Sequence, residues 1–177
     1  MKIAILGAEC TGKTTLAHTL ARTLDKPASP AHWVPEALRD WCRHHQRTPQ
    51  QHEQADIAAA QARAIDGAGP GDVLADTTPL MTAVYSDVLF QDPSLYQFAL
   101  AHHAGFDITL LTDTDLPWVA DGLQRDGPAW RDMVNARLRQ VLHEHALRYA
   151  LIQGRGEARA TNALAAIEQH RALAAWR

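Results

Sequence analysis

Residues 7–14 read Gly-Ala-Glu-Cys-Thr-Gly-Lys-Thr, directly after the apolar run Lys-Ile-Ala-Ile-Leu at residues 2–6. The run Thr-Leu-Ala-His-Thr-Leu-Ala at residues 15–21 follows and favours a helix. A G-x-x-x-x-G-K-T motif between a strand and a helix is a phosphate-binding loop in the context that it requires. We therefore expect this chain to bind a nucleoside triphosphate.

Each residue type in this loop suits phosphate binding. Gly7 and Gly12 permit backbone angles that other residues resist, so successive N–H groups can turn inward around a phosphate. The start of the following helix adds the positive end of a dipole. Lys13 can reach the β- and γ-phosphates, and the Thr14 hydroxyl can ligate Mg²⁺. The residues that we expect to contact the nucleotide here are Gly7, Ala8, Glu9, Cys10, Thr11, Gly12, Lys13, Thr14 and Thr15.

Size and composition indicate one soluble domain. The 177 residues suffice for one sizeable core, and we assign residues 1–177 to a single domain. The net charge of −3 argues against non-specific nucleic-acid binding, which depends on clustered Lys and Arg. No apolar run approaches the length of a membrane span, and no signal peptide is recognisable. We expect a cytoplasmic protein with a small-molecule acceptor and neither a nucleic-acid nor a membrane partner, and the oligomeric state stays open.

Short apolar runs alternate with helical stretches along the whole chain. Strands are expected at residues 2–6, 32–34, 72–75, 107–111 and 148–152, the second being the weakest. Helices are expected at residues 48–66, 92–105, 128–145 and 161–176, the first of them opened by Thr48 as N-cap and Pro49. This alternation predicts an α/β fold, a single-domain P-loop NTPase with a five-stranded parallel sheet and helices on both faces.

Charged residues follow the strands, at the edge where ligands bind in open α/β sheets. Glu36 and Arg39 follow the second strand, and Asp76 follows the third. Asp76 is a candidate for holding Mg²⁺, and Glu36 is a candidate base or hydroxyl binder for the acceptor. Arg155 follows the fifth strand and is a candidate nucleotide contact. A helix N-cap or a surface charge is the simpler interpretation of each carboxylate.

Residues 112–127 are too long and too polar for a plain connection between a strand and a helix. Trp118 favours packing or ligand contact over disorder. A lid over the nucleotide is one interpretation, with Arg125 able to contact phosphates when the lid closes. A surface loop anchored by Trp118 is the other.

Three stretches together resemble the ribosylnicotinamide kinase domain of the bifunctional NAD-biosynthesis and regulator proteins, within the P-loop kinase superfamily. They are the phosphate loop, the stretch D-T-T-P-L-M-T-A-V-Y-S at residues 76–86, and D-L-P-W-V-A-D-G-L-Q-R at residues 115–125. The segment Glu36-Ala37-Leu38-Arg39 is similar to the same family. The similarity extends over nearly the whole chain. Cys10 and Thr11 depart from the family pattern, because small hydroxyl residues are usual at these positions.

The resemblance implies transfer of the γ-phosphate of ATP, with Mg²⁺, to the 5′-hydroxyl of nicotinamide riboside, giving nicotinamide mononucleotide. Lys13, Glu36, Asp76 and Arg125 would carry the chemistry, and Thr14 and Asp76 would hold the metal. Glu36, Arg39, Asp115, Trp118 and Asp121 would bind the acceptor, Trp118 by offering an aromatic face to the cationic ring. The nucleotidyltransferase and DNA-binding activities of multidomain members are not inferred for this sequence.

Two other functions remain open. One is a regulatory P-loop NTPase, a switch or sensor in which hydrolysis drives a conformational change. The other is a kinase for a different nucleoside or a small hydroxylated metabolite.

Overall fold

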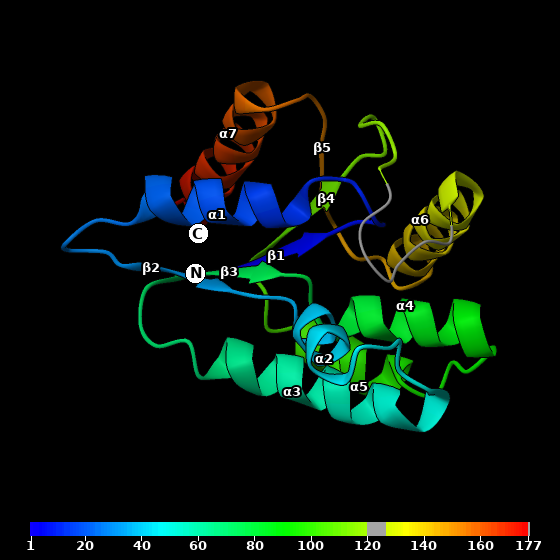
Figure 1. Ribbon diagram of the computed structural model, residues 1–177. Coiled ribbons are helices and arrows are strands. Elements are labelled where there is room, and N and C mark those ends of the chain that lie inside the picture. The colour runs from blue at the N-terminus through cyan, green and yellow to red at the C-terminus, as the bar shows by residue number, and fades with distance from the viewer. Residues whose placement is uncertain (120–126, 177) are drawn as a thin grey trace.

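A five-stranded parallel sheet lies at the centre of the molecule, whose computed structural model describes residues 1–119 and 127–176 (Figure 1). The strands are β1 (Lys2–Leu6), β2 (Ala31–Val34), β3 (Asp72–Asp76), β4 (Ile108–Thr112) and β5 (Ala150–Ile152). Their order across the sheet is β2-β3-β1-β4-β5, and each neighbouring pair is parallel. The expected α/β class and five parallel strands are therefore confirmed.

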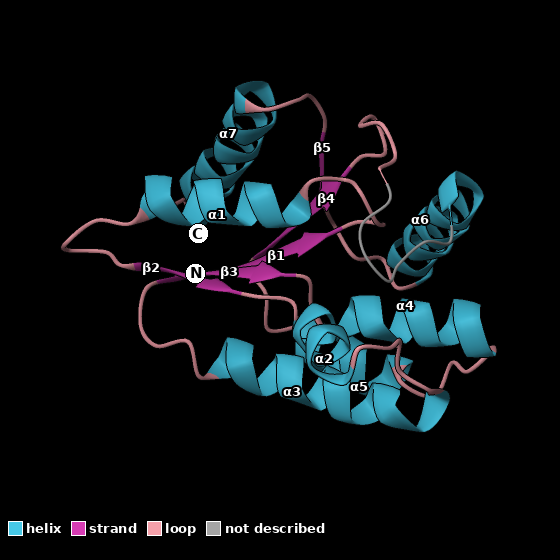
Figure 2. Ribbon diagram, in the orientation of Figure 1, coloured by secondary structure: helices cyan, strands magenta, loops and turns pink. Residues whose placement is uncertain are grey.

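Helices cover both faces of the sheet (Figure 2). They are α1 (Lys13–Leu24), α2 (Ala37–His45), α3 (Gln54–Asp66), α4 (Pro79–Phe90), α5 (Tyr96–His103), α6 (Gly127–Glu144) and α7 (Glu157–Ala174). Alternate residues of β1 point to opposite faces, as the pleat of a strand requires. Ile3 and Ile5 pack with α1 and α7, whereas Ala4 and Leu6 pack with α4 and α6. Both faces of the central strands are thus buried, which explains why these strands read as continuous apolar runs.

Several helix boundaries differ from the expected ones. The helix expected from Thr48 begins instead with a 3₁₀ turn, η1 (Gln51–Glu53), and Gln50 forms a capping box with Glu53. The helix expected from residue 92 begins at Tyr96, because Asp92 instead accepts a hydrogen bond from the Ser94 N–H in the preceding turn. Helix α4 was not predicted from the sequence. Residues 79–86 are all buried, so the helix lacks the alternation of apolar and polar faces by which a helix is recognised.

The strand order places the phosphate loop at the centre of the sheet edge. Strand β1 lies between β3 and β4. The connection after β1 leads to strands on one side of it, and the connection after β3 leads to strands on the other. In parallel sheets such a switch point forms a crevice at the carboxyl ends of the strands. In the register of the sheet, Ile5 of β1 lies beside Asp76 of β3, and Leu6 lies beside Leu111 of β4. Segments after β2 and β3 therefore lie on one side of the phosphate loop, and segments after β4 and β5 lie on the other.

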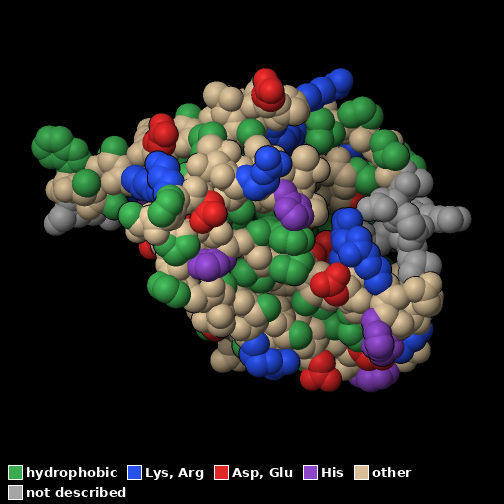
Figure 3. All heavy atoms as spheres, turned by 60° about the vertical axis from the view of Figure 1, so that its left-hand side comes forward, with side chains coloured by type: hydrophobic (Ala, Val, Ile, Leu, Met, Phe, Trp, Pro, Cys, Tyr) green, Lys and Arg blue, Asp and Glu red, His purple; other side chains and the backbone are tan. Residues whose placement is uncertain are grey.

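The surface shows no continuous basic area on the face in Figure 3, where Lys and Arg side chains lie among Asp and Glu side chains. Among the described helices, none combines the length and hydrophobicity needed to cross a bilayer.

Candidate active site

The phosphate loop has the conformation that its glycines allow. Gly7 has φ 149° and Gly12 has φ 76°, and Cys10 between them also has a positive φ of 55°. Gly12 directly precedes α1, which begins at Lys13. The Lys13 ammonium donates to the Ala8 carbonyl at 2.8 Å, which holds this side chain across the loop. The positive end of the helix and the Lys13 charge therefore converge on one cavity.

That cavity has a volume of about 180 Å³, and we call it the phosphate cavity. Its walls are formed by Glu9, Cys10, Gly12, Lys13, Thr14, Thr15, Glu36, Arg39 and Tyr85. The structure thus brings together the phosphate loop and the segment after β2, as expected from the strand ends.

Glu36 lies at the N-cap position of α2 and is 8% exposed. Burial raises the pKa of its carboxyl, an effect that the Lys13 charge opposes and the Asp76 charge reinforces. The Arg39 Nε lies 3.4 Å from a Glu36 carboxylate oxygen. A buried carboxylate beside a cation, in a cavity that also holds the phosphate loop, has the environment of a proton acceptor.

Asp76 ends β3 and is 1% exposed. Within the described part of the chain, its Oδ1 has no hydrogen-bond partner. A buried carboxylate is costly unless it is paired or coordinates a metal, and carboxylate oxygens are the ligands that Mg²⁺ prefers. The environment of Asp76 therefore fits a Mg²⁺ ion that accompanies a nucleotide, with the Thr14 hydroxyl available in the phosphate cavity as a further oxygen ligand.

A second cavity, with both polar and apolar residues in its walls and the apolar ones in the majority, adjoins the phosphate cavity and shares Glu9 and Tyr85 with it; we call it the apolar cavity. Its volume is about 290 Å³, and its remaining walls are Leu38, Cys42, Thr48, Pro49, Gln54, Leu89, Phe90 and Trp130. Sequence reasoning missed these residues, which come from α2, α3, α4, α6 and the segment before α3. The available signal was Gln54, which with Gln61 is one of two polar residues on the buried face of α3.

Two oxygen atoms in the walls of the apolar cavity are buried without hydrogen-bond partners among the described residues. They are Glu9 Oε2 and Gln54 Oε1. The side chain of Gln54 is almost wholly buried, at 1% exposure. The Tyr85 hydroxyl interacts with Glu9, and burial raises the pKa of this phenol well above its ordinary range. Buried oxygens of this kind are expected to find a donor when a ligand binds, because leaving them unpaired is costly.

A third cavity, of about 460 Å³, lies on the other side of the phosphate loop, and we call it the α1/α7 cavity. Its walls come from Gly12 and the first turns of α1, from Leu116, and from residues 156–164 at the start of α7. The neighbouring Arg155 side chain lies 3.4 Å from the Asp115 carbonyl. This cavity borders the phosphate loop on the side opposite Glu36, where the rest of a bound nucleotide could extend.

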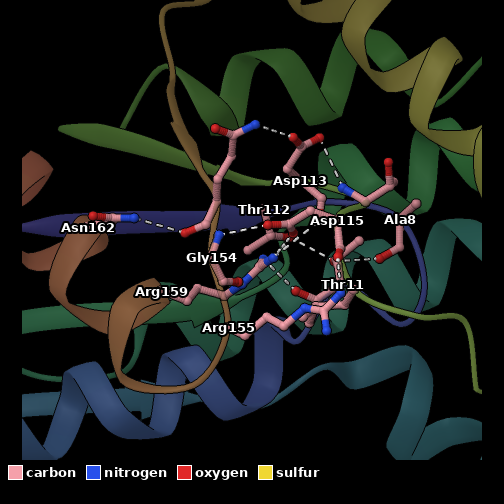
Figure 4. Close-up of polar contacts among 12 residues, drawn as sticks. Ala8, Thr11, Thr112, Asp113, Asp115, Gly154, Arg155, Arg159 and Asn162 are labelled. Atoms are coloured by element: carbon pink, nitrogen blue, oxygen red, sulfur yellow. Dashed lines mark hydrogen bonds and ion pairs between the residues drawn. The ribbon is translucent and has the colours of Figure 1, made fainter.

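Of the expected acceptor residues in the segment after β4, Asp115 and Trp118 are described, and neither lines the phosphate cavity or the apolar cavity. Asp115 belongs to the β4–β5 side, where its carboxylate pairs with Arg159 and accepts the Gly154 N–H at 2.7 Å (Figure 4). The guanidinium of Arg159 thus neutralises the negative charge of Asp115. Trp118 is half-buried, and within residues 1–119 and 127–176 it lines none of the three cavities. The aromatic walls of the apolar cavity are instead Tyr85, Phe90 and Trp130.

The rest of the proposed lid is described only in part. The Cys10 thiol donates to the Val119 carbonyl at 2.9 Å, which joins the segment to the phosphate loop. Arg131 of α6 donates to the Leu116 carbonyl at 2.9 Å. Asp121 and Arg125, expected to contact acceptor and phosphates, lie outside the described residues.

Solved structures with this fold include several kinases. Two structures of NadR protein, one in complex with NR and one with NAD and AMP-PNP, match with TM-scores of 0.75 and 0.73 at 20% and 19% identity. Each covers 96% of this chain, which spans only about half of the NadR chains, 50% and 49%. Deoxyadenosine kinase from M. mycoides with bound dCTP matches at a TM-score of 0.64 and 12% identity, covering 96% of this chain and 100% of its own.

Thymidylate kinase from Ehrlichia chaffeensis also matches, at a TM-score of 0.61 and 16% identity, with 95% of this chain and 97% of that chain covered. No curated protein matches by sequence. At these identities the structural matches establish the fold, which is that of P-loop kinases. A family model described as "AAA domain" matches residues 2–159, most of the chain. This protein therefore belongs to that AAA domain family of P-loop proteins.

Proposed function

We propose that this protein is an ATP-dependent kinase that phosphorylates a hydroxyl of a nucleoside, with the 5′-hydroxyl of nicotinamide riboside as the preferred acceptor. The observation that carries the proposal is the pair of adjoining cavities. One holds the phosphate loop and a buried carboxylate, and the other offers aromatic walls and two unpartnered buried oxygens. This arrangement suits a ligand with a hydroxyl at one end and a flat ring at the other.

The phosphate loop and Lys13 would bind the triphosphate of ATP. Bound Mg²⁺, held by Thr14 and Asp76, would neutralise charge on the phosphate oxygens. Lys13 would move from the Ala8 carbonyl to the β- and γ-phosphates, because a charged acceptor is the stronger partner. The α1/α7 cavity would take the nucleotide base.

Glu36 would receive the proton of the acceptor hydroxyl. The hydroxyl oxygen would form a bond to the γ-phosphorus as the bond from that phosphorus to the β–γ bridging oxygen breaks, leaving ADP and a phosphorylated nucleoside. The proton would pass to the Glu36 carboxylate, which must be ionised beforehand, a state that the Lys13 charge favours. Arg39, beside Glu36 in the same wall, would orient the carboxylate and contact the transferring group.

The apolar cavity would bind the ring of the acceptor. Tyr85, Phe90 and Trp130 offer aromatic surface, which attracts a flat cation. Glu9 Oε2 and Gln54 Oε1 are acceptors without donors, so they favour a ligand that brings positive charge and an N–H group. Nicotinamide riboside has both, in its pyridinium ring and its carboxamide. The NadR structure in complex with NR supports this choice at the level of the fold.

A kinase for another nucleoside is the second candidate. The amide of Gln54 can pair with any base edge that presents a donor and an acceptor side by side, which includes adenine. The match with deoxyadenosine kinase agrees with this alternative at the level of the fold.

The test is ADP release from ATP with nicotinamide riboside, adenosine, deoxyadenosine or thymidine as acceptor, and with none. Our proposal predicts the highest kcat/KM for nicotinamide riboside. Highest turnover with a neutral nucleoside would favour the second candidate, and slow hydrolysis that no acceptor accelerates would favour a regulatory NTPase. Gln54→Leu should raise the KM of nicotinamide riboside and leave that of ATP within about twofold, because the two sites are separate.

Lys13→Ala serves as the control for the phosphate side. The variant loses a charged donor that acts on the transferring phosphoryl group, so kcat should fall by roughly 10²–10³-fold. Its melting temperature should stay close to that of the parent chain, because the hydrogen bond that the Lys13 ammonium makes to the described residues stays within the loop. Turnover near that of the parent chain would contradict the assignment of the phosphate loop.

A further inference from the structure

A buried arginine joins three segments that lie far apart in the sequence (Figure 4). Arg159 lies in the first turn of α7 and is 4% exposed. Its Nε donates to the Gly154 carbonyl at 2.7 Å, and its Nη1 donates to the Thr11 carbonyl at 2.8 Å. Its Nη2 pairs with the Asp115 carboxylate and lies 3.5 Å from the Asp113 carbonyl. One guanidinium thus holds the phosphate loop, the segment after β4 and the segment after β5.

The contact with Thr11 fixes the direction of a phosphate-loop N–H group. The Thr11 carbonyl and the Gly12 N–H belong to one planar trans peptide, so they point in opposite directions. When Arg159 holds the carbonyl on one side, the Gly12 N–H is held on the other. Gly12 lies in the wall of the phosphate cavity, where such N–H groups bind anions.

The other groups of this network are themselves fixed. The second oxygen of Asp115 accepts the Gly154 N–H at 2.7 Å, so the carboxylate holds both Arg159 and the segment after β5. The Thr11 hydroxyl donates to the Ala8 carbonyl at 2.8 Å and lies 2.7 Å from the Thr112 hydroxyl. Arg159 also forms part of the wall of the α1/α7 cavity together with Gly12. The network therefore connects the two cavities that a nucleotide would span.

Only an arginine can make all of these contacts at once. Its planar fork presents five N–H donors in fixed directions, whereas a lysine ammonium is a single point of charge on a flexible stem. A lysine here could retain the pairing with Asp115 but could not also reach the Thr11 and Gly154 carbonyls.

We propose that Arg159 is a positioning residue for the nucleotide, which orients the Thr11–Gly12 peptide and ties the phosphate loop to the segment after β4. This inference rests on the proposed nucleotide site. It assigns no contact between Arg159 and the reacting atoms. The predicted consequence is a loss of nucleotide affinity when Arg159 is changed, with the affinity for the acceptor preserved.

The experiment measures binding of Mg·ADP by calorimetry to the parent chain and to Arg159→Ala, Arg159→Lys and Asp115→Asn. Arg159→Ala and Arg159→Lys should each raise the Kd about tenfold or more, as expected for loss of hydrogen bonds from a charged donor. Asp115→Asn, which keeps the shape but loses the charge, should raise the Kd less. In kinetics, the KM of ATP should rise, and the KM of the acceptor should stay within about twofold.

Arg171→Ala is the matched control. Arg171 lies on the same helix and pairs with Asp72, a buried carboxylate at the opposite end of the sheet. This variant also loses a partly buried ion pair, so its melting temperature should fall, but its Kd for Mg·ADP should stay within about twofold of the parent value.

Arg159 variants that melt earlier but bind Mg·ADP as tightly as the parent chain would overturn the inference, because Arg159 would then be structural alone. If Arg159→Ala does not fold, the Kd for Mg·ADP and the melting temperature of Arg159→Lys and Asp115→Asn are compared with those of the parent chain instead. A parent chain that binds Mg·ADP but phosphorylates no acceptor would contradict the proposed kinase function and leave the Arg159 inference to be judged on its own. A parent chain that binds no nucleotide would overturn both.

Discussion

At Gly7 the phosphate loop lies so close to β4 that no room is left for a side chain. A Cβ added to Gly7 would lie 2.2 Å from the Thr112 hydroxyl oxygen and 3.0 Å from the Thr112 carbonyl oxygen. The Thr112 hydroxyl is held in place, because it lies within hydrogen-bond distance of the Leu6 carbonyl and of the Thr11 hydroxyl. The first glycine of the motif therefore serves the contact with β4 as well as its own φ of 149°.

Gly7→Ala should lower the free energy of unfolding by roughly 2–4 kcal/mol, because a clash with fixed atoms adds to backbone strain. Gly69→Ala is the control, since Gly69 also has a positive φ, of 88°, but the nearest atom to an added Cβ is 3.8 Å away. Urea denaturation of both variants measures the difference. Equal losses in the two would show that the contact with Thr112 is unimportant.

Glu36 should make the rate of the reaction fall at acidic pH, and we call this part of the pH profile the acid limb. Its pKa lies above the ordinary value of 4.5 because of burial, and the carboxylate accepts a proton only when ionised. We expect kcat/KM for the acceptor to rise with pH through an apparent pKa above 4.5. Glu36→Gln should lower kcat by roughly 10²-fold or more and remove this limb.

As a control, binding of Mg·ADP is measured for the parent chain and for Glu36→Gln over the same range of pH. Binding to Glu36→Gln should match that of the parent chain, because the carboxylate serves the acceptor. If Glu36→Gln instead loses nucleotide binding and retains the acid limb, the role given to Glu36 is wrong.

At the scale of elements, α4 links the core to the apolar cavity. Its first eight residues are buried, and one of them, Tyr85, lines the cavity together with the later residues Leu89 and Phe90. Thr78 is the N-cap of the helix, and its hydroxyl accepts the Leu80 N–H at 3.2 Å; Pro79 follows as the first helical residue. This cap satisfies a backbone donor at a helix end that is wholly buried, where water cannot replace it.

Thr78→Ala should therefore lower the free energy of unfolding by about 1–2 kcal/mol, at the upper part of the range for a lost N-cap. Thr78→Ser keeps the hydroxyl and should recover most of this loss. Thermal and urea denaturation of the three chains measure it. A serine variant as unstable as the alanine variant would show that the methyl group matters and the cap does not.

At the scale of the whole molecule, a buried histidine should limit stability in acid. His103 of α5 is 4% exposed, and its Nε2 lies 3.0 Å from the Thr109 hydroxyl oxygen of β4. Burial lowers its pKa from 6.5 to about 4, and the neighbouring His102 contributes in the same direction. Between these two pH values the unfolded chain binds more protons than the folded chain, so stability falls as the pH decreases through this range.

The free energy of unfolding should be lower at pH 4 than at pH 7 by up to about 3 kcal/mol from this residue alone. His103→Gln should be less sensitive to acid, and the difference between the two chains isolates the histidine from the carboxylates. Urea denaturation at several pH values measures it. If the free energy of unfolding depends on pH in the same way in both chains, the expectation is contradicted.

The sequence by itself determined the fold class, the phosphate loop and the residues at the strand ends. Apolar runs followed by helical stretches predict a parallel sheet, because both faces of such a sheet must be covered. Residues 7–14 form a phosphate-binding motif in which each residue type is explained by the local geometry of the loop. The same local reasoning placed Glu36 and Asp76 near the loop, since the carboxyl ends of parallel strands meet at one edge. These features depend on neighbours in the chain.

The tertiary structure alone decided which of these groups meet. The strand order places the segments after β2 and β3 on one side of the phosphate loop and those after β4 and β5 on the other, so Asp115 pairs with Arg159 rather than facing Glu36. The apolar cavity takes Gln54 and Trp130 from helices distant in sequence, while Trp118 lies outside it. Strand order and helix packing are set by contacts between residues distant in sequence, and the local pattern of residues does not specify which segments meet.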